Sequence, residues 1–360
     1  MSTKKWVAYT SVMVLVLAFF TYVLSYTNIF AIEYRSMTAD VSEQFIPLPE
    51  LDKDDYNARL LALAHVSTST PVSSTATTSI RIATTTSLRW PVSTVYPNAG
   101  ALLPFKRVVA YYGNFYSKGM GVLGEYPTDE MLAMLASTTA LWTSADPSTP
   151  AVPAIHYIAV VAQASAGKEG KYILRMPDDQ IDHALALAQQ IQGLVFLDVQ
   201  VGLSTLEYEL PKLEKYLRMS QVHLAIDPEF SMKRGGRPGT VIGTFDATDI
   251  NYAAEYLASL VKKYHLPPKI FIVHRFTQKM VTNYEQIQPL PEVQIVIDMD
   301  GFGSKAKKYG TYNYIVAPEP VQFTGMKLFY KNDARPPADG LLTPAEVLKL
   351  TPAPIYIQYQ

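Results

Sequence analysis

Most of the chain after residue 105 repeats one pattern, in which a short apolar run rich in β-branched residues is followed by a segment of helical period. Eight such runs occur, at 107–113, 156–162, 194–200, 222–228, 269–275, 293–299, 325–330 and 354–359. Helical segments are expected at 128–138, 178–192, 204–219, 247–265, 304–316 and 343–350, with Thr128, Ser204 and Thr343 as N-caps. After the fifth run only 278–284 is available for a helix. This alternation predicts βα units around a parallel sheet.

The number of runs favours one closed barrel over an open sheet. Eight strands spread over about 255 residues match the usual size of a (β/α)8 barrel. The alternative is a doubly wound open sheet, whose nucleotide-binding members usually carry a glycine-rich turn that this sequence lacks. We therefore expect an α/β (β/α)8 TIM-barrel-like domain at residues 105–360.

The N-terminal region contains an uncharged apolar segment at residues 6–26, which reads WVAYTSVMVLVLAFFTYVLSY. As a helix it would be about 31 Å long, enough to cross the hydrocarbon core of a membrane. Lys4 and Lys5 precede it, and the next basic residue is Arg35. The positive-inside rule then predicts a single-pass anchor with residues 1–5 in the cytoplasm and the remainder outside. A cleaved signal peptide is the alternative, although no A-x-A site follows the segment.

Residues 27–104 are predicted to be an extracytoplasmic stalk rich in Ser, Thr and Pro. A short helix is possible at 54–66, but residues 67–97 have too few large apolar side chains to offset the entropy of ordering. An extended stalk of this composition would hold the barrel domain well clear of the membrane.

The composition excludes several classes of site. The 31 Lys and Arg residues nearly balance the 32 Asp and Glu residues, so no overall positive charge favours nucleic acid as a partner. There is no cysteine, which excludes disulfides, thiolate zinc sites and a cysteine nucleophile. No cofactor is expected, and no bound metal is part of the leading interpretation.

Charged residues follow several of the predicted strands. They are Asp198, Asp227, Glu229, His274, Asp298, Asp300 and Lys327. In a TIM barrel the carboxyl ends of all strands meet at one rim, so these side chains are expected to converge on one pocket. A carboxylate inside a strand that is buried on both faces is costly unless it has a partner or a chemical role.

Structural explanations exist for most of these residues. Asp198 could cap a turn, Asp227 before Pro228 could begin one, and His274 could be a hydrogen-bonded core histidine. Of Asp298 and Asp300, one is expected to bind backbone amides of the adjacent glycine turn. Lys327 could simply neutralise the excess of acidic groups.

Aromatic residues also gather near the predicted strand ends. They include Tyr111, Tyr112, Phe115 and Tyr116 after the first run, and Phe230, Phe276, Phe302, Phe329 and Tyr330 after later ones. Aromatic rings around carboxylates suit a carbohydrate, because the apolar faces of sugars stack on rings while their hydroxyls bind acids. We take Asp198, His274, Lys327, Tyr111, Tyr112 and Tyr330 as candidate substrate-binding residues.

The run VVAYYGNFYS, together with FLDVQ, AIDPEF and DMDGFG, resembles the barrel domains of glycoside hydrolases and of an uncharacterised group of bacterial extracytoplasmic proteins. The resemblance covers about residues 105–360. Many glycosidase barrels place an acid/base Glu after the fourth strand and a nucleophilic Glu after the seventh. Glu229 matches the first position, whereas Lys327 and Tyr330 occupy the region of the second.

Three functions follow from these patterns. The leading one is hydrolysis of a cell-surface or cell-wall polysaccharide, with Glu229 as general acid, Asp298 or Asp300 as base or nucleophile, and Asp227 beside them. The second is a metal-dependent esterase, deacetylase or phosphodiesterase with Asp198, Asp227, His274 and Asp298 as ligands. The third is a barrel that binds glycan without cleaving it.

Overall fold

The computed structural model describes residues 48, 50–66 and 89–360. The predicted anchor at 6–26, the preceding tail, and residues 27–47, 49 and 67–88 of the predicted stalk lie outside these residues. Within the described ranges, every helix is too short or too polar to cross a membrane. The described residues between Leu48 and Gln360 form one compact unit.

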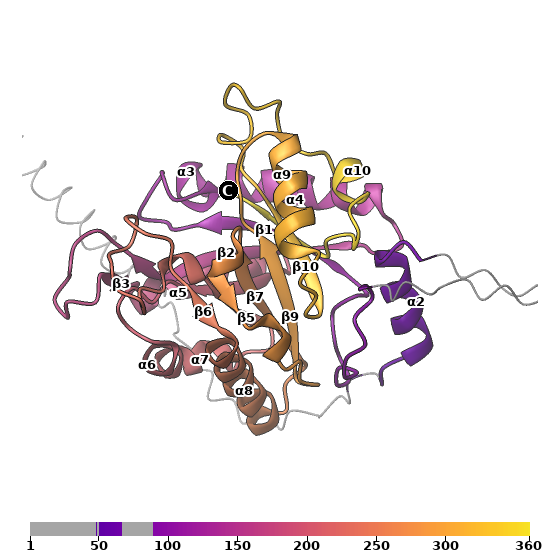
Figure 1. Cartoon of the computed structure of the whole chain (residues 1–360), viewed down its shortest axis with the longest axis horizontal. Coiled ribbons are helices and arrows are strands. Elements are labelled where there is room, and N and C mark those ends of the chain that lie inside the picture. Colours follow the sequence, from indigo (N-terminus) through magenta and orange to yellow (C-terminus); the bar gives the residue numbers. More distant parts are fainter. Residues whose placement is uncertain (1–47, 49, 67–88) are drawn as a thin grey trace, which may run out of the picture. The chain divides into compact units, whose positions relative to one another are not determined.

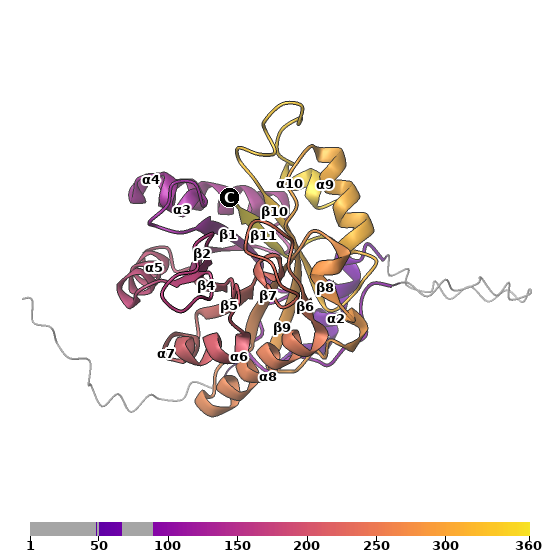
Figure 2. The same ribbon diagram turned by 60° about the vertical axis from the view of Figure 1, so that its left-hand side comes forward.

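This unit contains a closed barrel of parallel strands (Figures 1 and 2). Neighbouring strands pair in parallel around the barrel, and β1 pairs with both β11 and β2 to close it. The barrel strands are β1 (Arg107–Gly113), β2 (Ala151–Ala162), β4 (Leu194–Val199), β5 (Val222–Ile226), β7 (Lys269–Arg275), β9 (Val293–Met299), β10 (Phe323–Leu328) and β11 (Tyr356–Tyr359). A short strand, β3 (Ile173–Arg175), pairs antiparallel with β2. The predicted parallel barrel with surrounding helices is therefore confirmed.

Helices follow most of the barrel strands. They are α3 (Val122–Glu125), α4 (Thr128–Ala145), α5 (Asp178–Gln190), α6 (Leu206–Glu209), α7 (Glu214–Leu217), α8 (Ala247–Tyr264), α9 (Lys305–Thr311) and α10 (Pro344–Val347). The β7–β9 connection instead holds two 3-10 turns and β8 (Val281–Thr282), which pairs with β6 (Phe245–Asp246). The sequence predicted this weak connection.

Two expected N-caps are wrong and one is confirmed. The N-cap of α4 is Pro127, so Thr128 is the first helical residue. Thr205, one residue after Ser204, caps α6 by accepting a hydrogen bond from the amide of Tyr208. Thr343 forms a capping box with Glu346 at the start of α10, as a Thr-x-x-Glu sequence predicts.

The amino-terminal end of the barrel is covered by α2 (Lys53–Leu63), which confirms the short helix expected near 54–66. Tyr56 and Leu63 of this helix belong to the same buried cluster as Val108 and Phe196 near the starts of β1 and β4. Further on, the indole of Trp90 donates a 2.8 Å hydrogen bond to the carbonyl of Ala317. Described residues before Arg107 therefore pack with the barrel, which leaves its carboxyl-terminal end for a site.

Candidate active site

A cavity of about 630 Å³ lies at the carboxyl-terminal ends of the barrel strands. The rings of Tyr112, Phe230, Phe276, Phe302 and Phe329 form much of its wall. Its polar lining consists of Gln200, Asp227, Glu229, Thr277, Asp300, Lys307, Thr311, Lys327, Asn332 and Gln360. The structure thus brings the predicted residues Tyr112, Asp227, Glu229, Asp300 and Lys327 to one cavity.

Glu229 reaches this cavity from a short 3-10 turn, Pro228–Phe230, that follows β5. Asp227 is the N-cap of the turn, because its Oδ1 accepts a 3.0 Å hydrogen bond from the amide of Glu229. The structural explanation for Asp227 is therefore correct, and the residue lines the cavity as well.

Burial changes the acidity of both groups. It raises the pKa of Glu229, and the nearby negative charge of Asp300 raises it further, while Lys327 and His274 oppose the change. Burial raises the pKa of Asp227 well above its ordinary value, and the acidic neighbours Asp198, Asp300 and Glu229 add to this effect against His274. Both carboxyls can therefore keep a proton at a higher pH than exposed acids do.

Asp300 lines the same cavity in a different environment. Its Oδ1 lies 3.1 Å from Nζ of Lys327 on β10, and its Oδ2 lies 3.3 Å from Nδ1 of His274 on β7. Nζ of Lys327 also lies 3.8 Å from the ring centroid of Tyr112. Two basic side chains thus surround a carboxylate that lines the same cavity as Glu229.

Asp298 and Asp300 occupy different levels of the barrel. Asp298 is fully buried and lies 3.2 Å from Nδ1 of His274, whereas Asp300 lines the cavity. The glycine turn that follows is held by another acid, because the amide of Gly303 donates to Asp333. The expectation that one of the two aspartates binds this turn is not supported, and of the two only Asp300 lines the cavity.

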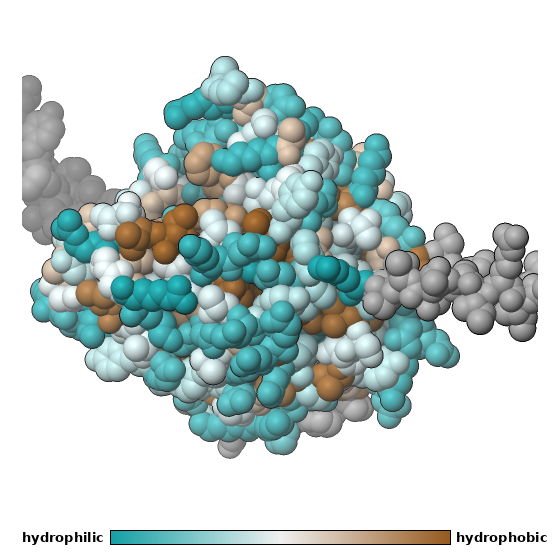
Figure 3. Space-filling model, viewed as in Figure 1, coloured by the Kyte–Doolittle hydropathy of each residue, from teal (hydrophilic) through white to brown (hydrophobic). Residues whose placement is uncertain are grey.

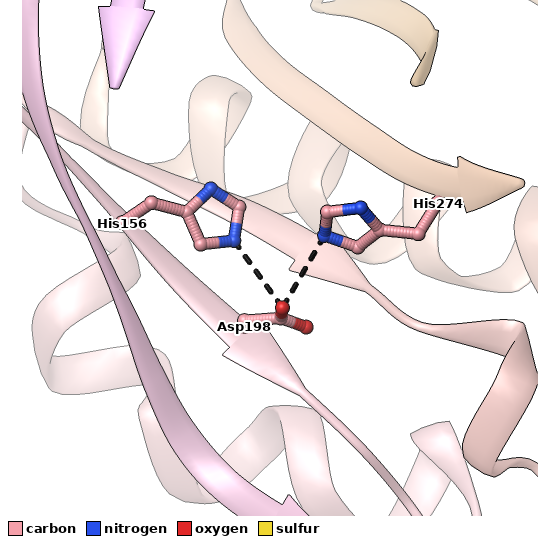
Figure 4. Close-up of side chains that lie close together, drawn as sticks. All are labelled: His156, Asp198 and His274. Carbon is pink, nitrogen blue, oxygen red and sulfur yellow. Dashed lines mark hydrogen bonds and ion pairs between the residues drawn. The ribbon is translucent and has the colours of Figure 1, made fainter. Parts of the chain in front are cut away.

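Below the cavity, His156, Asp198 and His274 form a fully buried cluster inside the barrel (Figure 4). Nε2 of His156 and Nε2 of His274 each lie 3.3 Å from Oδ2 of Asp198.

Burial lowers the pKa of His156 to about 4, against the opposing effect of Asp198. Burial alone would lower the pKa of His274, but Asp198, Asp298 and Asp300 raise it well above its ordinary value. Burial disfavours the charged form of Asp198, yet the two histidines hold its pKa below the ordinary value.

Tyr111 and Tyr330 lie elsewhere than the sequence predicted. The side chain of Tyr111 points out of the barrel, where its hydroxyl contacts Oγ1 of Thr138 and the hydroxyl of Tyr330, each at 2.9 Å. Because successive side chains of a strand point to opposite faces, Tyr112 then faces the barrel interior. Only Tyr112 of these three tyrosines lines the cavity.

Sequence reasoning missed His156 because it placed the second strand too late. The strand begins at Ala151, and Pro153 within it argues against an interior strand. Pairing of β2 with β4 begins at Ala154, just after the proline, so β2 accommodates Pro153 outside that ladder. Gln200, Asn332 and Gln360 were also missed, since they lie in loops or at the chain end, where no period marks them, and Lys307 was missed although it lies in the first turn of α9.

Comparisons with known proteins give no family for this chain. No protein-family model matches it, and no curated protein matches it. Among solved structures it is similar to a GH5-4 broad specificity endoglucanase from Clostridium longisporum, with 7% sequence identity and a TM-score of 0.32. The match covers 57% of this chain and 71% of the other. A similarity this distant carries no argument about activity.

Proposed function

We propose that this protein is a glycoside hydrolase that acts on a cell-surface or cell-wall polysaccharide. The observation that carries the proposal is the pairing of Glu229, whose pKa is raised, with Asp300, which is held between Lys327 and His274. Both carboxyls line one cavity with five aromatic rings. Two carboxyls in contrasting environments are what glycoside hydrolysis needs, one as acid and one as base or nucleophile.

In this mechanism Glu229 donates its proton to the glycosidic oxygen as the bond to the leaving sugar breaks. Asp300 then either attacks the anomeric carbon or removes a proton from the water that attacks it. The separation of the two carboxyls in a substrate complex decides between these outcomes. About 5 Å indicates retention of configuration, and about 6.5 to 9.5 Å leaves room for a water and indicates inversion.

The position of Lys327 explains how this barrel can work without an acid at the end of β10. The ammonium group of Lys327 contacts Asp300, which follows the neighbouring strand β9. Asp300, one strand away, would thus take the role of the nucleophile that many glycosidase barrels carry after the seventh strand. Asp227, which is buried, lies close to Glu229 in the sequence and has a raised pKa, is positioned to hydrogen-bond a sugar hydroxyl rather than to attack.

The metal-dependent hydrolase that the sequence also suggested receives less support. Its ligands would have to present a metal-bound water to a substrate in the cavity. Of the four predicted ligands, Asp198, His274 and Asp298 are fully buried and do not line the cavity, whereas Asp227 does. A hydrolytic metal would need groups that reach the cavity wall.

The proposal includes a location outside the cytoplasmic membrane, with residues 6–26 as a single-pass anchor. It rests on the uncharged apolar sequence of that segment and on Lys4 and Lys5 before it. In cells that express the full chain, the protein should stay with membranes after an alkaline wash, and added protease should degrade the barrel domain in spheroplasts. Release by the wash, or protection from protease, would contradict this location.

The catalytic proposal is tested with the full chain and a panel of purified cell-wall and surface glycans, by measuring new reducing ends. Glu229→Gln and Asp300→Asn should each lower turnover by about 10² to 10⁴. The exposed Glu285→Gln serves as a matched control and should retain activity. Saturable glycan binding without product would support a non-catalytic barrel, and undiminished turnover by Glu229→Gln would refute its assignment as the acid.

A further inference from the structure

The buried cluster beneath the cavity has the arrangement of a metal site. His156 on β2, Asp198 on β4 and His274 on β7 each offer one ligand atom, and these three atoms lie within 4.8 Å of one another. All three side chains are fully buried. Figure 4 shows the two imidazole rings on either side of Asp198, each with one nitrogen directed at the same carboxylate oxygen.

The spacing of these atoms is loose for hydrogen bonds between charged groups. Both Nε2 atoms lie 3.3 Å from Oδ2 of Asp198, whereas charge-assisted hydrogen bonds are usually about 2.7–2.9 Å long. Among the described residues, both ring nitrogens of His274, Oδ1 of Asp198 and both carboxylate oxygens of Asp298 have no hydrogen-bond partner of good geometry. Two ligands about 2.1 Å from a tetrahedral metal would stand about 3.4 Å apart, which is close to the observed spacing.

The other nitrogen of each histidine faces an outer polar group. Nδ1 of His274 lies 3.2 Å from Oδ2 of Asp298, and Nδ1 of His156 lies 2.6 Å from the hydroxyl of Tyr356 and 3.0 Å from Nε2 of Gln358. Metal-binding histidines almost always have such a partner, which fixes the ring and directs its free nitrogen to the metal. Both rings present Nε2 to the carboxylate of Asp198.

The charges around the cluster favour a cation of charge two. Asp198, Asp298 and Asp300 are three carboxylates that meet at His274, and Lys327 is the ammonium group that contacts them through Asp300. Three carboxylates thus face one ammonium group, and a divalent cation would offset this excess of acidic side chains.

We propose that His156, Asp198 and His274 bind a divalent first-row transition metal, with zinc as the best match to two imidazoles and one carboxylate. The ion would join β2, β4 and β7 inside the barrel and fix His274, which in turn contacts Asp300. Its ligands lie below the cavity wall, so the role is structural. The proposal does not depend on glycoside hydrolysis.

The test uses the full chain, stripped with a chelator, dialysed against zinc alone and examined by elemental analysis. We expect one zinc per chain and, at a hundredfold excess over Kd, an unfolding midpoint higher by about 5 °C. A cobalt-loaded sample should show the visible absorption of a low-coordinate site that includes imidazole. A chain that retains no metal in dialysis would overturn the proposal and leave a protonated His274 as the bridge between the acids.

Variants locate the bound ion. His156→Gln should weaken zinc binding by at least about 100-fold, and Tyr356→Phe, which removes only the outer hydroxyl, by about tenfold. His183→Gln, at an exposed histidine on α5, should bind as the wild type does. If Glu229→Gln lowers affinity as much as His156→Gln does, the cavity carboxylates hold the ion and the proposal fails. The Tyr356→Phe result decides the matter if His156→Gln does not fold.

Discussion

Nζ of Lys327 lies 3.1 Å from Oδ1 of Asp300, and the side chains of both residues are less than a tenth exposed. An ion pair this deeply buried has lost most of its hydration, so each charge depends on the other for compensation. The pair also places a positive charge beside Asp300, the proposed base or nucleophile. Lys327 provides this charge from β10, the strand after which a second acid was expected.

Replacing only one member of this pair should destabilise the fold. Lys327→Met leaves Asp300 with one basic neighbour, His274, and should lower the free energy of unfolding by about 3 kcal/mol in urea titrations. Adding Asp300→Asn should restore part of that loss. Lys331→Met, which removes a mostly exposed partner of Glu125, is the matched control and should cost less than about 1 kcal/mol. Equal losses in the two lysine variants would contradict the argument.

The pH profile of hydrolysis should report the proton on Glu229. Burial and Asp300 raise its pKa, and the general acid must be protonated, so kcat/KM should fall as pH rises through that value. Lys327 opposes the shift, so Lys327→Met should move the alkaline limb to higher pH. Glu229→Gln should abolish this limb. A limb that persists unchanged in Glu229→Gln would assign the proton to another group.

Asp227 should make the folded state less stable as pH rises. Its pKa in the folded state lies well above the value near 3.9 of an unfolded aspartate, so folding is favoured more by the protonated form. The cost is absent below about pH 4 and grows toward neutral pH. Asp227→Asn keeps an oxygen for the amide of Glu229 and should raise the free energy of unfolding at pH 7, by about 1.4 kcal/mol for each unit of pKa shift removed.

The measurement for Asp227 is urea unfolding at pH 4 and pH 7. The gain from Asp227→Asn should appear at pH 7 and vanish near pH 4. Asp129→Asn, at an exposed position in the first turn of α4, should change stability by less than about 0.5 kcal/mol at either pH. A loss of stability in Asp227→Asn at pH 7 would mean that the carboxylate is ionised and compensated.

The barrel strands were predictable because parallel strands buried on both faces read as continuous apolar runs. The bounds of β1, β7 and β9 match the predicted runs, and every residue of these strands is buried. The helix predicted at 204–219 is instead broken into α6, a 3-10 turn and α7, because Pro211 has no amide hydrogen to continue the helix. Sequence period alone overlooked this break.

The candidate site was predictable only in part. The rule that strand ends meet at one rim placed Asp227, Glu229, Asp300 and Lys327 together, because it needs only the position of each strand end. To choose between Tyr111 and Tyr112, one must know which face of β1 points into the barrel. A strand buried on both faces has no polar and apolar alternation that would reveal this. His156 required the true start of β2, which Pro153 obscured.

An exposed ring at the cavity should contribute to glycan binding without supporting the fold. Phe302 is 53% exposed and packs edge-on against Phe329, with ring centroids 5.8 Å apart. Phe302→Ala should weaken glycan binding by about three- to tenfold in calorimetry and leave the unfolding midpoint nearly unchanged. Tyr314→Ala, at a ring that is 76% exposed and does not line the cavity, is the control. Equal affinity in both variants would remove Phe302 from the binding surface.

Polar groups dominate the face of the barrel shown in Figure 3, where apolar residues form small separate groups.

The apolar side of α2 packs into the protein interior, since Tyr56 is only 2% exposed at the amino-terminal end of the barrel. Tyr56→Ala should leave a cavity there and lower the free energy of unfolding by about 3–5 kcal/mol in urea titrations. Tyr56→Phe keeps the ring and should cost less than about 1.5 kcal/mol. If Tyr56→Ala unfolds at the wild-type urea concentration, α2 is not part of the cooperative unit and the barrel folds without it.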